Sequence, residues 1–180
     1  NPAALRKIYA IKNRPLDHPL ILHLADAAAL PEWVVEVPPA AQVLAAHFWP
    51  GPLTLVLRRA PGVPDELTGG QDSVAIRVPS HPVAQALLRA FGGGIAAPSA
   101  NRYGRVSPTR AAHVREEFPE GIAVILEGGD CEVGLESTIV ALLGPLPQLL
   151  RPGGIPRAEI EAVLGAPVAT VVAAPVPRVP

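Results

Sequence analysis

The stretch Ser73-Val-Ala-Ile-Arg-Val78 decides the fold, because its side chains alternate with the period of two that is typical of a β-strand. The alternation places the three branched apolar side chains on one face and Ala75 and Arg77 on the other. An apolar run over residues 53–57, LTLVL, precedes it and predicts a neighbouring strand. An arginine on such a strand needs either solvent or an anionic partner, so an exposed sheet surface and an anion site both remain open for Arg77.

Predicted helices and strands alternate around this strand without forming one repeated unit. Asn1 and Pro2 are a good opening for a helix that delivers Lys12, and Pro15 breaks it. Further helices are predicted over 40–48, 82–91, 108–118 and 156–164, and further strands over 20–24, 95–97, 122–126, 138–143 and 148–150. This order predicts an α/β or α+β fold with a mixed, twisted β-sheet flanked by helices.

The composition is that of an ordinary globular domain. The chain has 180 residues, of which 49% are hydrophobic and 17% charged, and its formal net charge is -1. This charge provides no general attraction to nucleic acid or membrane, and no apolar run approaches the ~20 residues needed to span a bilayer. Cys131 is the only cysteine, so it forms no internal disulfide and has no partner for zinc. We expect Cys131 to be a small buried residue, and a cytoplasmic location fits.

The two ends of the chain differ from the rest. The sequence contains no methionine and opens inside a predicted helix, so we expect its natural N-terminus to be missing. Residues 166–180 are rich in Pro, Val and Ala and nearly free of charge, which is typical of an extended linker or tail. We therefore predict one folded domain over residues 1–165, followed by a Pro-rich linker over 166–180.

Most of the usual catalytic signatures are missing from the sequence. There is no G-x-x-x-x-G-K-[ST], no H-E-x-x-H, no G-x-S-x-G and no G-x-G-x-x-G after a strand, which argues against P-loop and Rossmann nucleotide binding. The five histidines, at positions 18, 23, 47, 81 and 113, show no metal-ligand spacing. Each is expected to be a surface or satisfied core residue, and no metal site made by the protein is predicted.

Polar segments remain at the ends of the predicted elements. Lys12 and Arg14 lie at a helix end held by proline, which suits a phosphate, although cations at a helix C-terminus are also common for dipole reasons. The segment 98–101, PSAN, follows an apolar strand at its carboxyl end, where α/β sheets place ligands, but it is equally typical of a capped turn. The segments 136–138, EST, and 151–154, RPGG, also lie at strand ends where side chains can converge.

Joined in order, these segments resemble one family. They read KNRPLDHPLILHL at 12–24, WPGPLTLVL at 49–57, SVAIRVP at 73–79, AAPSANRYGRVSPT at 96–109, ESTIV at 136–140 and RPG at 151–153. Their order and spacing are similar to those of the YrdC/Sua5 (TsaC) family of threonylcarbamoyl-AMP synthases, from the first helix to about Gly154. The resemblance implies a YrdC-like twisted sheet with a concave, positively lined cavity. It also implies a nucleotidyltransferase that joins L-threonine, bicarbonate and ATP into threonylcarbamoyl-AMP, releases pyrophosphate and serves the modification of adenosine 37 in tRNA.

The resemblance implies roles for particular residues. ATP contacts are implied for Lys12, Arg14, His18, Ser73, Ser99, Ser107 and Arg151, and threonine contacts for His23, Arg77, the backbone at Ala97 and Ser137. Among these, Lys12, Arg14 and Arg77 would align the two anions and stabilise developing charge, and Asn101 would support the same region. ATP is implied as a substrate, with Mg²⁺ held through its phosphates. Implied partners are RNA and downstream threonylcarbamoyl-transferring proteins.

The chain departs from the family pattern in three places. Members begin with a strand and a P-T-[DE]-T-x-Y-G-L segment, and this chain starts after it, so we expect weak or no activity from the chain by itself. His18 stands where the family often has Asn, which keeps a hydrogen-bonding group. A C-terminal Sua5 domain is also absent, which leaves a short single-domain enzyme and a shortened two-domain enzyme both open.

Two other functions stay open on the sequence. YrdC-like domains also occur in carbamoyltransferases, where they adenylate a carbamoyl group. Alternatively, the basic cavity binds the backbone of RNA, double-stranded RNA included. The neutral total charge and the 4% of aromatic residues argue against RNA binding as the main role.

Overall fold

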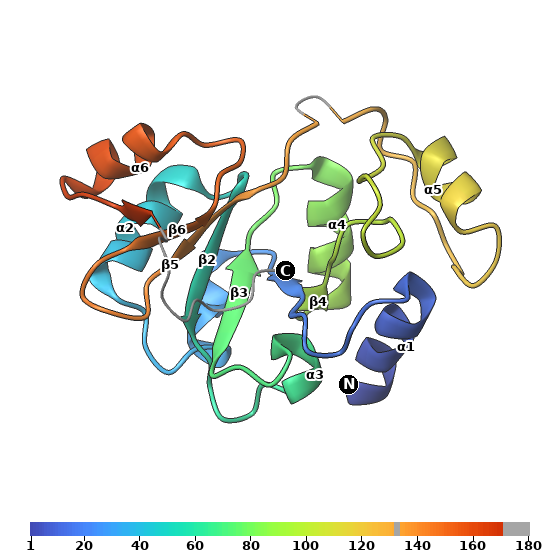
Figure 1. Ribbon diagram of the computed structural model, residues 1–180, viewed down its shortest axis with the longest axis horizontal. Coiled ribbons are helices and arrows are strands. Elements are labelled where there is room, and N and C mark those ends of the chain that lie inside the picture. Colours follow the sequence, from blue (N-terminus) through green and yellow to red (C-terminus); the bar gives the residue numbers. More distant parts are fainter. Residues whose placement is uncertain (132–133, 171–180) are drawn as a thin grey trace.

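The computed structural model describes residues 1–131 and 134–170, and its centre is a seven-stranded sheet (Figure 1). The strands lie in the order β4-β1-β3-β2-β5-β6-β7. They are β1 Ile21–His23, β2 Leu53–Arg58, β3 Ser73–Arg77, β4 Ile95–Ala96, β5 Thr138–Ala141, β6 Gln148–Arg151 and β7 Ala169–Thr170. β1 pairs with β3, β2 with β5 and β6 with β7 in parallel, whereas the other three pairs are antiparallel. The predicted mixed sheet flanked by helices is confirmed.

The helices begin and end largely where the sequence signals place them. They are α1 Pro2–Lys12, α2 Pro39–Phe48, α3 Asp65–Thr68, α4 Pro82–Phe91, α5 Ala111–Glu117 and α6 Arg157–Leu164, with a 3-10 helix at Ala27–Glu32. The Asn1 side chain accepts hydrogen bonds from the first turn of α1, and Pro2 occupies its first position. α1 ends because Asn13 adopts a left-handed conformation with φ 51°, which turns the chain toward Arg14.

The sheet separates two apolar clusters. The larger one covers the face of Leu55, Ile76 and Val140, and it receives buried side chains from α1, α2 and α6. In Figure 1 α2 and α6 lie beside β5 and β6, while α1, α4 and α5 lie on the β4 side of the sheet. Each fully buried Leu or Ile of this cluster contributes about 1.5–3 kcal/mol relative to an exposed one. Tertiary packing on this face therefore supplies most of the stability of the domain.

The opposite face of the sheet carries a smaller cluster of five buried residues, which are Ile21, Val56, Ala75, Ile139 and Ala141. The alternation of β3 thus holds in the structure, but the face of Ala75 is buried rather than open to solvent. Arg77 lies two residues beyond Ala75 on this same face and is only partly exposed. The exposed-surface alternative for Arg77 is therefore wrong.

Several predicted elements differ from the structure. The strand predicted at 122–126 is absent, and Val124 and Leu126 of this segment are exposed, because no neighbouring strand pairs with it. The helix predicted from Pro108 begins only at Ala111. The 3-10 helix, α3 and β7 were not predicted, because each is too short to show a periodic pattern of apolar residues in the sequence.

The predicted linker is corrected at its start. Val168 is buried, and β7 pairs with β6, so residues up to 170 belong to the sheet rather than to an extended linker. The remaining part of that prediction, 171–180, lies outside the described residues. Cys131 is exposed, so the expectation that it is buried is wrong. Among the helices of the described residues, none has the length and apolar character to cross a bilayer.

Candidate active site

A polar group continues the smaller apolar cluster toward one end of the sheet. The parallel pairing of β1 and β3 sets His23 beside Arg77, just as it sets Ile21 beside Ala75. Because residues two apart share a face, His23 and Arg77 project on the side of the small cluster. The Arg77 Nε donates to the carbonyl of Gly51 at 2.9 Å, which fixes the guanidinium at the strand end.

Three further side chains join this group: Thr54 of β2, Ser137 directly before β5, and Arg151 of β6. Thr54 lies two residues before Val56 on β2, and its Oγ1 is 2.8 Å from the Oγ of Ser137. Arg151 on β6 donates to the carbonyl and the Oγ of Ser137, both at 3.0 Å. The strand register therefore gathers hydroxyl, guanidinium and imidazole groups from β1, β2, β3, β6 and the residue before β5 at one end of one face.

Burial decides the charges of this group. Burial, followed by the nearby charge of Arg77, lowers the pKa of His23 to about 4, so this imidazole is neutral at pH 7. Burial also lowers the pKa of Arg77 and of Arg151, yet guanidinium groups stay protonated at neutral pH. The site thus presents two poorly solvated cations beside a neutral hydrogen-bonding ring, which favours an incoming carboxylate.

Lys12 at the end of α1 holds the loop that carries Ser99 and Asn101. Its Nζ donates to the carbonyl of Ser99 at 2.5 Å and to the carbonyl of Asn101. Both Lys12 and Asn101 are buried, and the Asn101 side chain donates to the carbonyls of Arg102 and Arg105. Burial, with a smaller effect of Arg14, lowers the pKa of Lys12 to about 8. Lys12 is therefore mainly protonated at pH 7 and close to its titration range.

Arg14, His18 and Tyr103 form a cluster next to Lys12. The Arg14 guanidinium donates to the carbonyl of Pro19 at 2.8 Å and lies 5.6 Å from the centroid of the Tyr103 ring. The hydroxyl of Tyr103 is 3.2 Å from Nδ1 of His18, and its backbone N–H donates to the carbonyl of Lys12 at 2.8 Å. Tyr103 thus joins the loop to Lys12, Arg14 and His18, three of the seven residues for which the resemblance implied ATP contacts.

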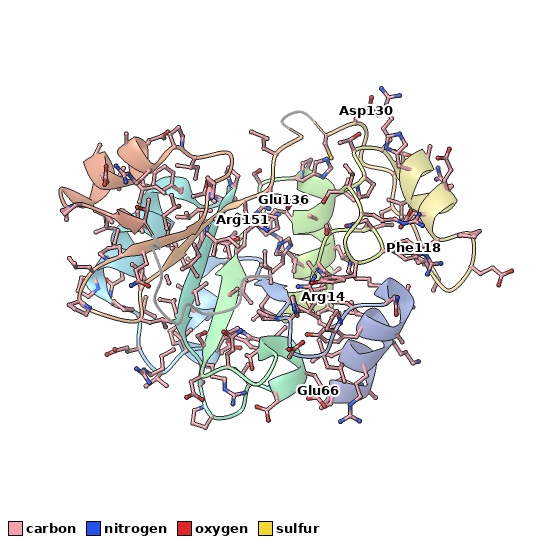
Figure 2. All side chains as sticks on the ribbon, in the orientation of Figure 1. Arg14, Glu66, Phe118, Asp130, Glu136 and Arg151 are labelled. Carbon is pink, nitrogen blue, oxygen red and sulfur yellow. The ribbon has the colours of Figure 1, made fainter. Side chains whose placement is uncertain are left out.

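The residues around Lys12 and Arg14 line a polar cavity of about 290 Å³. Its walls include Lys12, Arg14, His18, Ser99, Asn101, Tyr103, Ser107 and Glu136. Glu136 precedes Ser137 directly, and its negative charge opposes the lowering of the pKa of Lys12, Arg77 and Arg151 alike. Figure 2 shows Glu136 beside Arg151, between the strands and the side of the molecule that holds Arg14. Glu136 therefore connects the cavity with the end of the sheet where Arg77 and Arg151 lie.

The structure brings together most of the side chains that were predicted to form one site. Lys12, Arg14, His18, Ser99, Asn101 and Ser107 line the cavity, and His23, Arg77, Ser137 and Arg151 form the adjoining sheet end. The N–H of Ala97 is used by the carbonyl of Ile21 at 2.8 Å, so a ligand contact from Ala97 would come from its own carbonyl.

Ser73 is the predicted site residue that the structure does not bring to the cavity. It is buried at the opposite end of β3 from Arg77, and it does not line the cavity. Four residues of strand separate the two Cα atoms by roughly 13 Å. The nucleotide contact of Ser73 stays a prediction.

A larger cavity of about 500 Å³ lies elsewhere, between α2 and the 3-10 helix. Apolar side chains such as Leu30, Trp49 and Val78 form much of its wall, and none of the predicted site residues lines it. Size alone would favour this cavity as the site. We assign the chemistry to the smaller one, because only there do buried cations and hydroxyl groups converge.

Three residues of the site were missed by the sequence predictions: Thr54, Tyr103 and Glu136. Thr54 was detectable, because it lies two residues before Val56 and so shares a strand face with it, just as Arg77 shares a face with Ala75. Glu136 and Tyr103 stood inside the quoted segments, but nothing in their spacing shows which way their side chains point.

The fold and the site together define a class: an α/β domain whose mixed sheet ends beside a polar cavity lined by cations. A sequence family described as Telomere recombination, which unites Sua5, YciO and YrdC proteins, matches residues 1–153. The chain therefore belongs to the Sua5/YciO/YrdC family.

Relatives of the chain agree with this assignment. A threonylcarbamoyl-AMP synthase of Pyrococcus abyssi is 48% identical over 162 residues, which cover 90% of this chain and 48% of that protein. A threonylcarbamoyl-AMP synthase of Bacillus subtilis is 48% identical over 169 residues, which cover 92% and 48%. The crystal structure of P. abyssi Sua5 complexed with L-threonine matches with a TM-score of 0.91 and 46% identity, over 94% of this chain and 49% of that one. The chain spans about half the length of these curated relatives.

Proposed function

We propose that this chain carries the active site of an L-threonylcarbamoyladenylate synthase. In this reaction the threonine amine and bicarbonate form a carbamate and water, and the carbamate and ATP give threonylcarbamoyl-AMP and pyrophosphate; the product serves the modification of adenosine 37 in tRNA. The observation that supports the proposal best is the convergence of two sets of groups. A carboxylate-binding sheet end with Arg77, His23 and Ser137 adjoins a cation-lined cavity with Lys12 and Arg14. The names of the two relatives that are 48% identical agree with it.

The residue types suit this chemistry. A carbamate oxygen must attack the α-phosphorus, so the enzyme must hold two mutually repelling anions in line and stabilise the charge of the departing pyrophosphate. Arg77 offers a planar fork for the threonine carboxylate, while Lys12 and Arg14 offer charge to the phosphates. Neutral His23 accepts or donates a hydrogen bond there without adding a charge. No covalent nucleophile is needed.

ATP is proposed as a substrate, and Mg²⁺ is proposed to enter with it. Within the described residues, no three or more His, Cys, Asp or Glu side chains gather to hold a metal ion. Mg²⁺ commonly keeps its water and binds through substrate phosphates, so its oxygen ligands at this site would come mainly from the nucleotide. Its chemical contribution would be to neutralise phosphate charge.

Partners and location follow as parts of the same proposal. The product is expected to pass to threonylcarbamoyl-transferring proteins that act on tRNA, with RNA contact as a secondary role of the cation-lined cavity. A cytoplasmic location agrees with this use. Residues 1–165 remain our predicted catalytic unit, with the sheet extended to residue 170 by β7.

A pyrophosphate-release assay tests the proposal. The protein that carries this chain is supplied with ATP, bicarbonate and L-threonine, and each substrate is omitted in turn. We expect pyrophosphate release that depends on threonine, and threonylcarbamoyl-AMP as the product by mass spectrometry. Release that needs carbamoyl phosphate in place of threonine would identify the carbamoyl-adenylating alternative. No release, together with RNA binding that weakens steeply with salt, would identify an RNA-binding module.

A further inference from the structure

Glu136 is a carboxylate placed inside a site built for anions. Its Oε1 accepts a hydrogen bond from the Oγ of Ser107 at 2.5 Å, and its Oε2 lies 3.8 Å from a terminal nitrogen of Arg151 (Figure 2). It lines the same cavity as Lys12 and Arg14. Its side chain is 49% exposed, so part of it faces solvent.

The two groups that Glu136 contacts are donors that an oxyanion in this cavity would use. Ser107 comes from the loop after β4 and lines the cavity, and Arg151 comes from β6, so Glu136 links this wall of the cavity to the wall formed by the adjoining sheet end. A phosphate group entering between these walls meets a carboxylate that already accepts from Ser107 and neutralises Arg151. Like charges at such short range repel, so the phosphate and the Glu136 carboxylate exclude each other from this position.

We propose that Glu136 occupies the position of a phosphate group in the empty site, leaves it when a polyphosphate binds, and returns as pyrophosphate departs. The inference rests on the proposed function, since it assigns Ser107 and Arg151 to the phosphates of the nucleotide. In the empty site Glu136 keeps the clustered cations compensated, which offsets their mutual repulsion. In the loaded site it is a competing anion that weakens the hold on pyrophosphate and so promotes product release.

The test measures binding of inorganic pyrophosphate and of ATP by calorimetry to the wild type and to Glu136→Gln. The glutamine keeps the size of the side chain and removes its charge. We expect the variant to bind pyrophosphate about fivefold more tightly, a modest factor because the carboxylate is half exposed and screened. Pyrophosphate should also inhibit the variant at lower concentration. Glu127→Gln removes the same charge from an exposed position of the same connecting segment and should leave both affinities unchanged.

A structure of the wild-type protein with pyrophosphate is the second measurement, and it does not depend on the folding of any variant. We expect the 2.5 Å contact between Glu136 and Ser107 to be broken in that complex. Unchanged or weaker pyrophosphate binding by Glu136→Gln, or a preserved contact in the complex, would overturn the inference. Failure of the wild type to bind either ATP or pyrophosphate would instead overturn the proposed function, so the two failures are distinguishable.

Discussion

Protonation of His23 should destabilise the folded protein by a calculable amount. Its pKa is about 4 in the folded chain and about 6.5 when unfolded, so between these values the unfolded state binds more protons. The stability that depends on neutral His23 is therefore present above pH 6.5 and is lost as the pH falls toward 4. Applied from pH 7 to pH 5, this linkage removes about 2 kcal/mol from the free energy of unfolding.

Urea unfolding at pH 7 and pH 5 measures this loss, and His23→Gln isolates it. The variant cannot be protonated, so its stability should fall by about 2 kcal/mol less than that of the wild type over the same interval. His47→Gln removes an exposed histidine at the end of α2 and should keep the wild-type pH dependence. Equal losses in the wild type and His23→Gln would refute the reasoning. Threonine should raise the pKa of His23, because its carboxylate would offset the charge of Arg77 that lowers it.

The other predictions concern binding and backbone fit. ATP affinity should fall about tenfold between pH 7 and pH 9, because Lys12, with its pKa of about 8, loses its charge over this interval. Calorimetry measures this change, and Lys12→Ala should bind ATP weakly with an affinity that no longer depends on pH over the same interval. Arg77→Ala should raise the KM for threonine at least tenfold and leave the Kd of ATP nearly unchanged, and unaltered threonine kinetics would remove Arg77 from the site. Gly153→Ala should lower the unfolding free energy by roughly 1–3 kcal/mol, because its Cβ would lie 2.4 Å from the carbonyl oxygen of Glu136. Urea unfolding tests this, with Gly144→Ala, where nothing lies within 4 Å, as the control.

The elements that the sequence predicted well are those whose local signals agree with their packing. α1 has a capping Asn, a first-position Pro and apolar residues at helical spacing, and the structure uses all of them. The predicted alternation of β3 side chains between the two faces of the sheet is likewise confirmed, and each face packs into an apolar cluster. The segment 122–126 has the composition of a strand but no partner strand, and a partner is a long-range fact that local propensity does not contain.

The same distinction applies to the site. Strand parity alone predicts that Arg77 shares a face with Ala75 and Thr54 with Val56, whereas the contact of Thr54 with Ser137 needs the pairing of β2 with β5. The neighbourhood of His23 and Arg77 needs the parallel pairing of β1 with β3, which periodicity does not contain; the resemblance implied a threonine contact for both residues without giving that pairing. The side-chain direction of Glu136 depends on Ser107, 29 residues away in the sequence, so no local pattern could reveal it.

A different cation holds each end of the site, Arg77 at the sheet end and Lys12, beside Arg14, at the cavity, and this difference suits the two anions of the proposed reaction. Arg77 lies on a strand whose fork-shaped guanidinium is held by the Gly51 carbonyl, and it keeps its charge at every physiological pH. Lys12 is a point charge already bound by two carbonyls, and its pKa of about 8 lets small changes in its surroundings alter its charge. A rigid planar donor matches a carboxylate that must be held in one orientation, whereas a responsive point charge matches phosphates whose charge redistributes during transfer. Exchanging them should therefore impair threonine selection at one end and the response to phosphate charge at the other.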